Sequence, residues 1–556
     1  MTRIFYLLLI ALSMQAQDYT LGVGVYPGDP KENFAPAMSI DSGTYRNLAL
    51  HRPAWHSSSY DYNLTAQLVT DGIKETALPR WVATSTSQQG LLKKNEREWL
   101  LDGNWVTGVD FSASMAWVQL ELGGGETPLE IDRIDIDGTV RSLAADLEIW
   151  ACTVSGSDDG ATWHELGHAE GMARTTGEMR PSVKFAAPSR HRFYRIAFSD
   201  PRARAWRVTE VTLFRGGQPV PVGGPHRFTS AWKSAGAGEE WVYVDLGAAC
   251  TFDRVALYWI RRAAEGSLQV SDDAVAWRQV AALPSTGATD DLKLAPPARA
   301  RYVRVLMRKP ASPEGYILSE LEVFGKGGPV PHAKPGPSPS ATRLELSGGA
   351  WRVERDSLVK ADGPALAKPG FDDATWLPAT VPGTVLASYL NAGAIADPNF
   401  SDNQMMVSDT FFQADFWYRN EFTAPPAFSG KKVWLNFDGV NWKAEVYLNG
   451  EKLGRIEGAF IRGRFDVTAK LLAGRKNALA VRILKTATPG AIKEATILNT
   501  DKNGGALGAD NPAFHASIGW DWIPTIRGRE TGIWNRVYLD ATGPVTLRNP
   551  DRKSVV

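Results

Sequence analysis

The stretch WVYVDLG at residues 241–247 has a counterpart, WVQLELG, at residues 117–123. Three more segments follow each stretch in the same order and register: GSDDGATWHEL (156–166) corresponds to VSDDAVAWRQV (270–280), RFYRIAF (192–198) to RYVRVLM (301–307), and VTEVTLFRGG (208–217) to LSELEVFGKGG (318–328). The segments alternate apolar and polar residues and are separated by Asp-Asp, Gly and Pro turns, which is typical of antiparallel strands. The repeat therefore predicts two consecutive β-sandwiches.

Working outward from the repeat, we expect an all-β chain of three consecutive antiparallel β-sandwiches with no TIM barrel, because no strand-helix-strand alternation is present. The expected units are two sandwiches at residues 44–217 and 225–325, a Pro- and Gly-rich extended linker at 326–342, a third sandwich at 343–543 and a short tail at 544–556. The first copy alone is preceded by the segments Asn47-Leu48-Ala49 and Asp71-Gly72, so the second copy is expected to lack their counterparts. Asn449-Gly450 in the third unit predicts a hairpin with a type I′ turn.

Composition narrows the function classes. The 556 residues suffice for several domains, and 61 basic residues balance 61 acidic ones. Without a net positive field, neither nucleic acid nor an anionic membrane is an expected partner. Cys152 and Cys250 fall in different expected domains, which favours two isolated buried thiols over a disulfide.

The N-terminus predicts export. Arg3 is followed by an apolar stretch over residues 4–12 and then by polar sequence, the pattern of a short secretory signal peptide, here assigned to residues 1–16. The apolar stretch is too short to span a bilayer. We therefore expect a soluble mature chain in the periplasm or outside a bacterial cell.

The repeated segments, together with the Asn-Leu-Ala and Asp-Gly segments, resemble discoidin-type domains (the coagulation factor 5/8 C family), which include many galactose-binding-like carbohydrate modules. The third unit resembles the N-terminal sugar-binding jelly roll of family 2 glycoside hydrolases, close to the β-mannosidase and exo-β-glucosaminidase branch. The second resemblance rests on these segments: WRVERD at 351, VPGTVLASYL at 381, WYRNEF at 417, WLNFDGVNWKAEVYLNG at 434, FDVT at 465, and NPAFHASIGWDWIPTIRGRETGIWNRVYL at 511–539.

The resemblance implies that this chain binds the sugar and that a separate catalytic barrel cleaves the glycosidic bond. Retaining glycosidases of that family use two barrel carboxylates, and no residue here is assigned either role. We therefore expect the chain to be the carbohydrate-binding N-terminal portion of an exported exo-β-glycosidase, inactive by itself, with an oligo- or polysaccharide as its partner. The alternative is a stand-alone carbohydrate-binding or adhesion protein without catalytic activity.

The resemblance also supplies candidate substrate contacts at Trp520, Asp521 and Trp522. An indole face can cover the apolar side of a pyranose while a carboxylate accepts hydrogen bonds from two hydroxyls. The other interpretation is an aromatic plug in which Asp521 caps a turn. Arg527 and Arg529 are potential ion-pair partners of Asp521, although loop arginines are more often solvated.

Two further sites are expected in the discoidin-like modules. An aromatic cluster at Trp55, Tyr60 and Tyr62, with His56 beside it and Trp105 in the insertion at residues 75–109, is a candidate glycan platform, although packing roles are equally consistent with it. No cofactor is required, but a structural Ca²⁺ is common in such modules. By resemblance its oxygen ligands would come from Asp71, Thr76 and Glu210.

Overall fold

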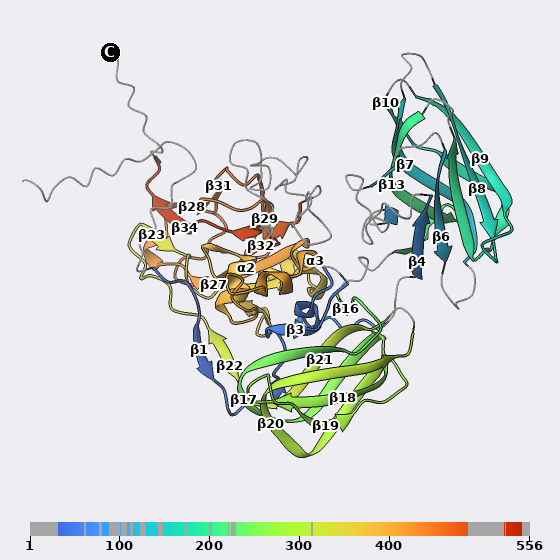
Figure 1. Cartoon of the computed structure of the whole chain (residues 1–556). Helices are drawn as coiled ribbons and strands as arrows, with labels where there is room; N and C mark the ends of the chain where they lie inside the picture. The colour runs from blue at the N-terminus through green and yellow to red at the C-terminus, as the bar shows by residue number, and fades with distance from the viewer. Residues whose placement is uncertain are drawn as a thin grey trace, which may run out of the picture.

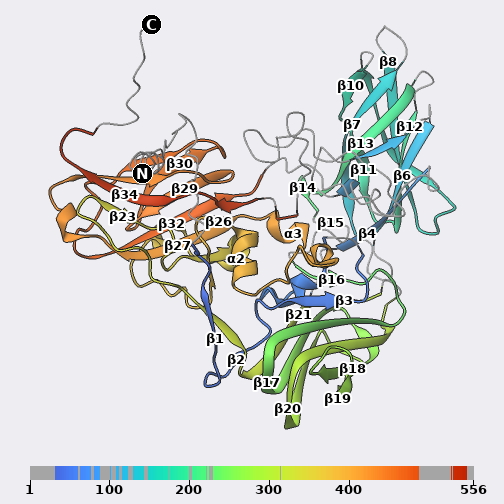
Figure 2. The same cartoon turned by 60° about the vertical axis from the view of Figure 1, so that its left-hand side comes forward.

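The computed structural model describes residues 32–486 and 527–546, apart from 61–62, 77–79, 88–99, 102–107, 112–114, 123–128, 143–147, 174–175, 200–202, 221, 224–229, 313–314 and 529. In this part the chain forms mainly antiparallel sheets, arranged as three sandwich units with a few short helices (Figures 1 and 2). The prediction of an all-β fold of galactose-binding-like sandwiches is confirmed. None of the described helices is long and apolar enough to cross a membrane.

One sandwich, here called the inserted sandwich, spans residues 80–223. Its first sheet has the order β10 (Thr176–Met179), β7 (Ile131–Ser142), β13 (Ala203–Arg215) and β14 (Gln218–Pro219), with β11 (Ser182–Ser189) on β7 and β5 (Val109–Phe111) on β13. Its second sheet has the order β15 (Val222–Gly223), β4 (Arg80–Thr86), β6 (Met115–Leu122), β12 (Phe193–Ser199), β8 (Glu148–Ser157) and β9 (His164–Ala173). A separate core, which includes Tyr194, Phe198 and Trp206, fills the space between the sheets.

A second unit, here called the split module, is built from two separate parts of the chain. Its main sheet has the order β16 (Trp232–Lys233), β21 (Ile317–Lys326), β17 (Glu240–Arg261), β20 (Thr289–Pro310), β18 (Ala263–Ser271) and β19 (Arg278–Ala282). The early strands β2 (Arg46–Asn47) and β3 (Ala54–His56) pair with β21 and β17, and the 3-10 helix η1 (Ala66–Thr70) packs on the same unit.

The expected domain boundaries at 44–217 and 225–325 are therefore wrong for the opening segments. Asn47 lies opposite Phe324 in the sheet, and its side-chain oxygen accepts the backbone N–H of Val323 at 3.0 Å. The Asn-Leu-Ala and Asp-Gly segments thus complete the second copy, which does not lack them. The inserted sandwich interrupts that module, and its two ends meet where Val222 pairs in parallel with Arg80.

The third unit, the C-terminal sandwich, begins near residue 343. One sheet has the order β23 (Arg343–Glu345), β34 (Val537–Thr542), β28 (Lys432–Phe437) and β31 (Gly463–Asp466). The other has the order β25 (Leu377–Pro378), β24 (Arg352–Arg355), β27 (Phe416–Thr423), β32 (Lys476–Leu484), β29 (Lys443–Leu448) and β30 (Glu451–Glu457), and β26 (Gly383–Thr384) pairs separately with β33 (Gly532–Ile533). The short helices are α1 (Gly363–Leu366), α2 (Val385–Asn391) and α3 (Asp409–Phe412), with 3-10 turns η4 (Asp356–Leu358), η5 (Asn403–Met406) and η6 (Pro426–Phe428).

The predicted hairpin in this sandwich is confirmed. Asn449 and Gly450 connect β29 to β30 with φ values of 50° and 90°. Both values lie in the left-handed region that a type I′ turn requires, which explains the Asn-Gly pair.

The split module and the C-terminal sandwich share one hydrophobic core. Leu64, Leu68 and Ile317 of the split module belong to the same buried cluster as Tyr389 and Phe411 of the C-terminal sandwich. Figures 1 and 2 both show α3 at this boundary, next to β3 and β16. A shared core makes the two units a single packed body rather than two domains on a flexible tether.

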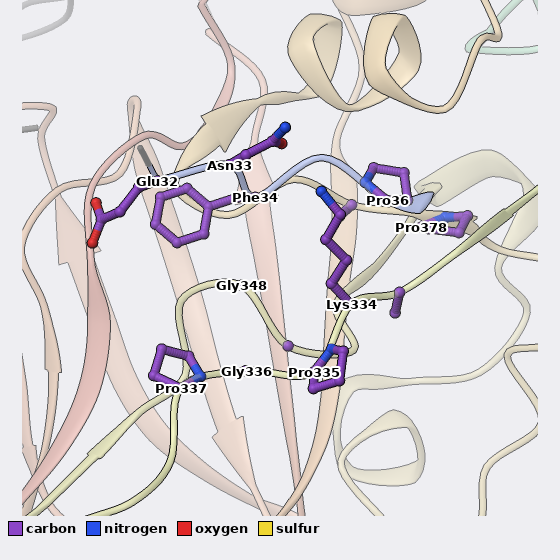
Figure 3. Close-up of a pocket in the computed structure, with 13 residues that line it drawn as sticks. Glu32, Asn33, Phe34, Pro36, Lys334, Pro335, Gly336, Pro337, Gly348 and Pro378 are labelled. Atoms are coloured by element: carbon purple, nitrogen blue, oxygen red, sulfur yellow. The ribbon is translucent and has the colours of Figure 1, made fainter. Parts of the chain in front are cut away.

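The predicted linker at 326–342 is extended, and a strand pair holds it. Its segment β22 (Pro329–His332) pairs antiparallel with β1 (Ala37–Ile40), which lies just after the start of the described chain. Beyond this pair, a cavity of about 270 Å³ opens between the N-terminal segment and the linker, lined by residues such as Phe34, Lys334 and Pro378 (Figure 3).

The topology predicts that the inserted sandwich can be removed without unfolding the rest. It has its own core, and its ends are adjacent, so replacing residues 77–229 with a short Gly-Ser linker should shift the unfolding temperature of the remainder by less than about 5 °C. Circular dichroism during heating measures this shift. Removal of residues 44–217 is the control, and it should abolish the cooperative transition of the split module because it deletes β2, β3 and η1. The opposite ranking of the two deletions would contradict the split arrangement.

Candidate functional site

The candidate sugar-binding residues Trp520, Asp521 and Trp522 lie outside the described residues, as does Arg529. The structure does describe the chain that follows this loop, beginning at Arg527. Arg527 is 3% exposed, and its Nη1 donates to the carbonyl oxygens of Met405 and Val407 at 3.0 Å each. The expectation of a solvated loop arginine is therefore wrong at position 527.

The same returning segment is fixed a second time next to β33. Asn441 and Gly532 exchange two backbone hydrogen bonds of 2.8 and 3.0 Å, and the side-chain amide of Asn441 donates to the carbonyl of Glu530 at 3.1 Å. Asn441 is 1% exposed. Buried, hydrogen-bonded residues thus fix the chain directly after the predicted sugar-binding loop.

Of the candidate platform residues, Trp55 lies in a row of half-buried aromatic rings on the face of the sheet opposite the core of the split module. Its ring stacks on Tyr243 at a centroid distance of 5.2 Å, and Tyr243 stacks on Trp241 at 5.3 Å. Trp277 and Tyr302 also contact Tyr243, at 5.5 and 6.0 Å. Because neighbouring rings cover one another's faces, the row offers mainly ring edges and its outer members to a sugar.

Among the described residues, the platform candidate Tyr60 does not join this row. Tyr60 packs against the shared core, with the ammonium of Lys233 5.0 Å from its ring centre. Tyr62 and Trp105 lie outside the described residues. Sequence reasoning missed Tyr243, although its position two residues after Trp241 in an alternating strand places both on one face.

The repeat clarifies which aromatic contacts belong to the scaffold. In the inserted sandwich the guanidinium of Arg195 lies 4.7 Å from the ring centre of Trp117 and 3.9 Å from that of Trp163. The counterpart Arg304 lies 4.1 Å from the ring of Trp277 in the split module. A contact between arginine and tryptophan that both copies keep is best explained as packing of the scaffold. Trp55 is not part of this repeated contact, since it lies on β3 of the split module.

Asp71 lies in a buried acidic turn that directly follows η1 and packs against the distant strand β21. It is 4% exposed, its Oδ1 accepts the N–H of Ile73 at 3.0 Å, and its other oxygen accepts the hydroxyl of Ser230. Glu320 of β21 is fully buried, and both of its carboxylate oxygens lie 3.2 Å from the N–H of Gly72. Burial, reinforced in Glu320 by the nearby Asp71 charge, raises the pKa of both carboxyls.

This arrangement corrects the expected set of Ca²⁺ ligands. Glu210 lies in β13 of the inserted sandwich, opposite Asp137, and thus in a different sheet from the one that holds the Asp71-Gly72 turn. Its repeat counterpart Glu320 occupies the place that was assigned to Glu210. Thr76 follows the turn and is exposed. Among the described residues, no group of three or more His, Cys, Asp or Glu is arranged to hold a metal ion.

Charged residues of the C-terminal sandwich meet this turn. The Nη1 of Arg355 lies 3.6 Å from the Oδ2 of Asp71, and both side chains are almost fully buried. The neighbouring Glu354 accepts the backbone N–H of Arg355 at 2.8 Å. Burial raises the pKa of the Glu354 carboxyl from 4.5 to about 8, against the lowering effect of that hydrogen bond.

The shifted pKa of Glu354 predicts a pH-dependent stability. The pKa of the Glu354 carboxyl is higher in the folded protein than in the unfolded protein, so its protonation stabilises the folded state fully at pH values below about 4.5. This stabilisation is lost as the pH rises towards 8. Between about pH 5 and about pH 9, unaltered protein should therefore lose on the order of 1–4 kcal/mol of unfolding free energy relative to Glu354→Gln. Urea denaturation of both proteins at the two pH values measures the difference. Glu451→Gln, at an exposed position on β30, is the control, and an equal pH dependence in all three proteins would contradict the prediction.

Two family models match parts of this chain. Residues 360–535 match the family model described as glycosyl hydrolase 2 galactose-binding domain-like, and residues 222–305 match the NedA-like, galactose-binding domain of F5/8 type C proteins. The chain therefore contains a family 2 glycosidase-type galactose-binding-like domain and an F5/8 type C domain. Over part of its length it is also distantly related to exo-glucosaminidases and mannosidases of family 2.

Two curated relatives and one solved structure illustrate these matches. An exo-β-D-glucosaminidase of Streptomyces avermitilis is 29% identical over 42% of this chain and 24% of its own, and a mannosylglycoprotein endo-β-mannosidase of Lilium longiflorum is 33% identical over 35% and 21%. The match thus spans about a quarter or less of these relatives. A chitosan-binding module 2 from a chitosanase/glucanase of Paenibacillus sp. IK-5, solved with chitotriose, is 35% identical over 17% of this chain and 78% of its own, with a TM-score of 0.17.

Proposed function

We propose that this chain is the carbohydrate-binding N-terminal portion of an exported family 2 exo-β-glycosidase, and that it binds the end of a β-linked glucosamine- or mannose-containing glycan. The observation that carries the proposal is the glycosidase-type match over residues 360–535, which includes Asp521 in the Trp-Asp-Trp loop. The names of the glucosaminidase and mannosidase relatives suggest the sugar class. Export is part of the same proposal and rests on the N-terminal sequence.

Two structural features support this role. Arg527 and Asn441 hold the chain that leaves the Trp-Asp-Trp loop, so the loop starts from a rigid base. The split module packs onto the C-terminal sandwich through a shared core, which holds an accessory carbohydrate module firmly against the sandwich that carries that loop in its sequence. A module held close raises the local concentration of the polymer near the pocket. In such an enzyme, bond cleavage would belong to a barrel and not to these sandwiches.

Substitution of the loop carboxylate tests the proposal. Asp521→Ala should weaken binding of a terminal glucosamine or mannose about 10- to 100-fold, because a charge-assisted pair of hydrogen bonds is lost. Isothermal titration with both monosaccharides and with chitotriose measures the affinities. Asp466→Ala, at an exposed strand end in the same sandwich, is the control. Equal affinity of all three proteins would show that Asp521 does not contact sugar, and glycan binding that depends only on the split module would favour a stand-alone binding protein.

We also propose a structural Ca²⁺ beside the Asp71-Gly72 turn. Two buried carboxylates, Asp71 and Glu320, lie near one another, with Glu322 also close and with Arg355 and Lys74 as nearby positive charges. Carboxylate oxygens are the ligands that a divalent ion such as Ca²⁺ prefers. Backbone carbonyls of the turn would complete the set. When bound, the ion would hold η1 against β21 and would take no part in bond cleavage.

The repeat offers a matched control for the ion. Addition of Ca²⁺ should raise the unfolding temperature of the unaltered protein by a few degrees, about 2–4 °C per kcal/mol gained for a packed body of more than 150 residues. Glu320→Gln should abolish the increase, whereas Glu210→Gln, at the counterpart position of the inserted sandwich, should retain it. Calorimetry with and without a chelator provides the measurement. An unchanged unfolding temperature in excess Ca²⁺ would rule out the ion.

A further inference from the structure

One face of the split module, opposite its core, carries the aromatic row, which consists of Trp55, Trp241, Tyr243, Trp277 and Tyr302. Trp55 on β3 lies opposite Tyr243 on β17, and Tyr243 lies opposite Arg304 on β20. Arg304 in turn lies opposite Gln269 on β18. Neighbouring strands are about 4.8 Å apart, so these four positions extend about 14 Å across the sheet. The row is therefore part of an extended surface that can contact more than one unit of a polymer.

Several polar atoms at the ring edges of this row are not used by the protein itself. The hydroxyls of Tyr243 and Tyr302 and the indole N–H of Trp241 have no hydrogen-bond partner among the described residues. The indole N–H of Trp277, by contrast, donates to the carbonyl of Ala274 at 3.2 Å. Burial raises the pKa of both tyrosines, so their hydroxyls stay protonated near neutral pH and can donate as well as accept. The row thus combines apolar ring surface with polar groups that can bind a ligand.

The inserted sandwich shows that this fold does not require a tyrosine at the centre of the face. Its counterpart of Tyr243 is Gln119, whose side-chain oxygen accepts the Nη2 of Arg195 at 2.8 Å. In the split module the corresponding Arg304 donates from Nε to the side-chain oxygen of Gln269, also at 2.8 Å. Because this glutamine lies on β18, the central position on β17 is left for the tyrosine. The tyrosine is an addition to the packing that both copies share, and that packing does not explain its hydroxyl.

The charges and the exposure of this face favour a neutral polar ligand. Asp245 is paired with Arg301 through two hydrogen bonds of 2.8 Å each, and Arg304 donates to Gln269. No ring of the row is among the exposed large apolar side chains of the described residues, which argues against a partner protein that buries an apolar patch. Half-buried rings with unused hydroxyl and indole groups instead match a neutral sugar, because its C–H groups contact the rings while its hydroxyls form the hydrogen bonds.

We propose that the aromatic row is a glycan-binding surface, which holds a neutral β-linked oligosaccharide across β3, β17 and β20. The inference rests on the proposed function for the class of ligand, whereas every residue of the surface belongs to the split module. Trp55 forms the end of the row that faces the C-terminal sandwich, since its indole N–H lies 3.4 Å from the side-chain oxygen of Asn403 in η5. A glycan bound across the strands therefore runs towards that sandwich. In this arrangement the module orients the polymer in addition to holding it.

Removal of single polar groups from the row tests the surface. Tyr243→Phe and Trp241→Phe each keep an aromatic ring and remove one unused donor. Each should weaken binding of mannohexaose about three- to tenfold, because one hydrogen bond to the glycan is lost. Tyr45→Phe is the matched control, since the Tyr45 hydroxyl already donates to Asp253 at 2.7 Å, and it should change the affinity less than twofold. Isothermal titration of the full chain with mannohexaose and with chitohexaose provides the affinities.

Chemical modification of tyrosines locates the bound glycan without any substitution. Saturating mannohexaose should slow nitration of Tyr243 and Tyr302 by tetranitromethane, because the bound chain covers their rings. Nitration of Tyr45, which is 50% exposed, should proceed at an unchanged rate. Peptide mass spectrometry after short reaction times gives the rate at each position, so the test remains decisive if a variant does not fold.

The outcomes distinguish the surface from the function on which it rests. Weaker binding in Tyr243→Phe and Trp241→Phe, with protection of Tyr243 from nitration, supports the inference. If the unaltered protein binds mannohexaose but neither the two affinities nor the nitration rates change, the surface is overturned and the proposed function stands. If neither mannohexaose nor chitohexaose binds, both are overturned. A dimer in sedimentation that Tyr243→Arg converts to a monomer would assign the face to a second copy of the chain and would also overturn the inference.

Discussion

Residues 45–76 precede the inserted sandwich in the chain, but they complete a sheet whose other strands follow it. The rest of the structure depends on this pairing. Through this pairing Asn47 reaches Val323, and η1 reaches the boundary with the C-terminal sandwich. The entropy of closing a long loop grows only slowly with its length, so a folded insertion with adjacent ends adds little cost. The parallel pair of Val222 with Arg80 provides those adjacent ends. A module interrupted by another module can therefore still close its own core.

The boundary between the split module and the C-terminal sandwich combines a continuous apolar core with buried charges. Leu64 and Leu68 supply apolar area, while Asp71 meets Arg355 and Glu320 meets the Gly72 N–H. Burying such charges is expensive, and a buried ion pair is weak evidence for stability by itself. Its directional contacts instead restrict how the two units can dock. The apolar core holds the split module and the C-terminal sandwich together without specifying one orientation. We interpret the polar contacts of the boundary as the element that fixes their relative orientation.

Local features of the fold could be predicted from the sequence, whereas the pairing of distant strands could not. The Asn449-Gly450 turn is determined by its own two residues, and Asp273 caps its turn by accepting the N–H groups of Val275 and Ala276 at 2.8 Å. The repeat likewise revealed the sandwiches. It could not show that β2 pairs with a strand some 275 residues later, because alternation defines a strand's faces but not its neighbour.

The same limit explains why the predictions for Glu210 and Arg527 were wrong. Glu210 and Glu320 occupy equivalent positions of one motif, so local sequence favours neither as the partner of the Asp71-Gly72 turn. Only the sheet that receives β2 selects Glu320. Arg527 is a related case, since a loop arginine is usually solvated, and its burial follows from carbonyls about 120 positions earlier in the chain. The partners of Glu320 and Arg527 are thus determined by topology, while the residues proposed to touch the sugar are recognisable in a short local motif.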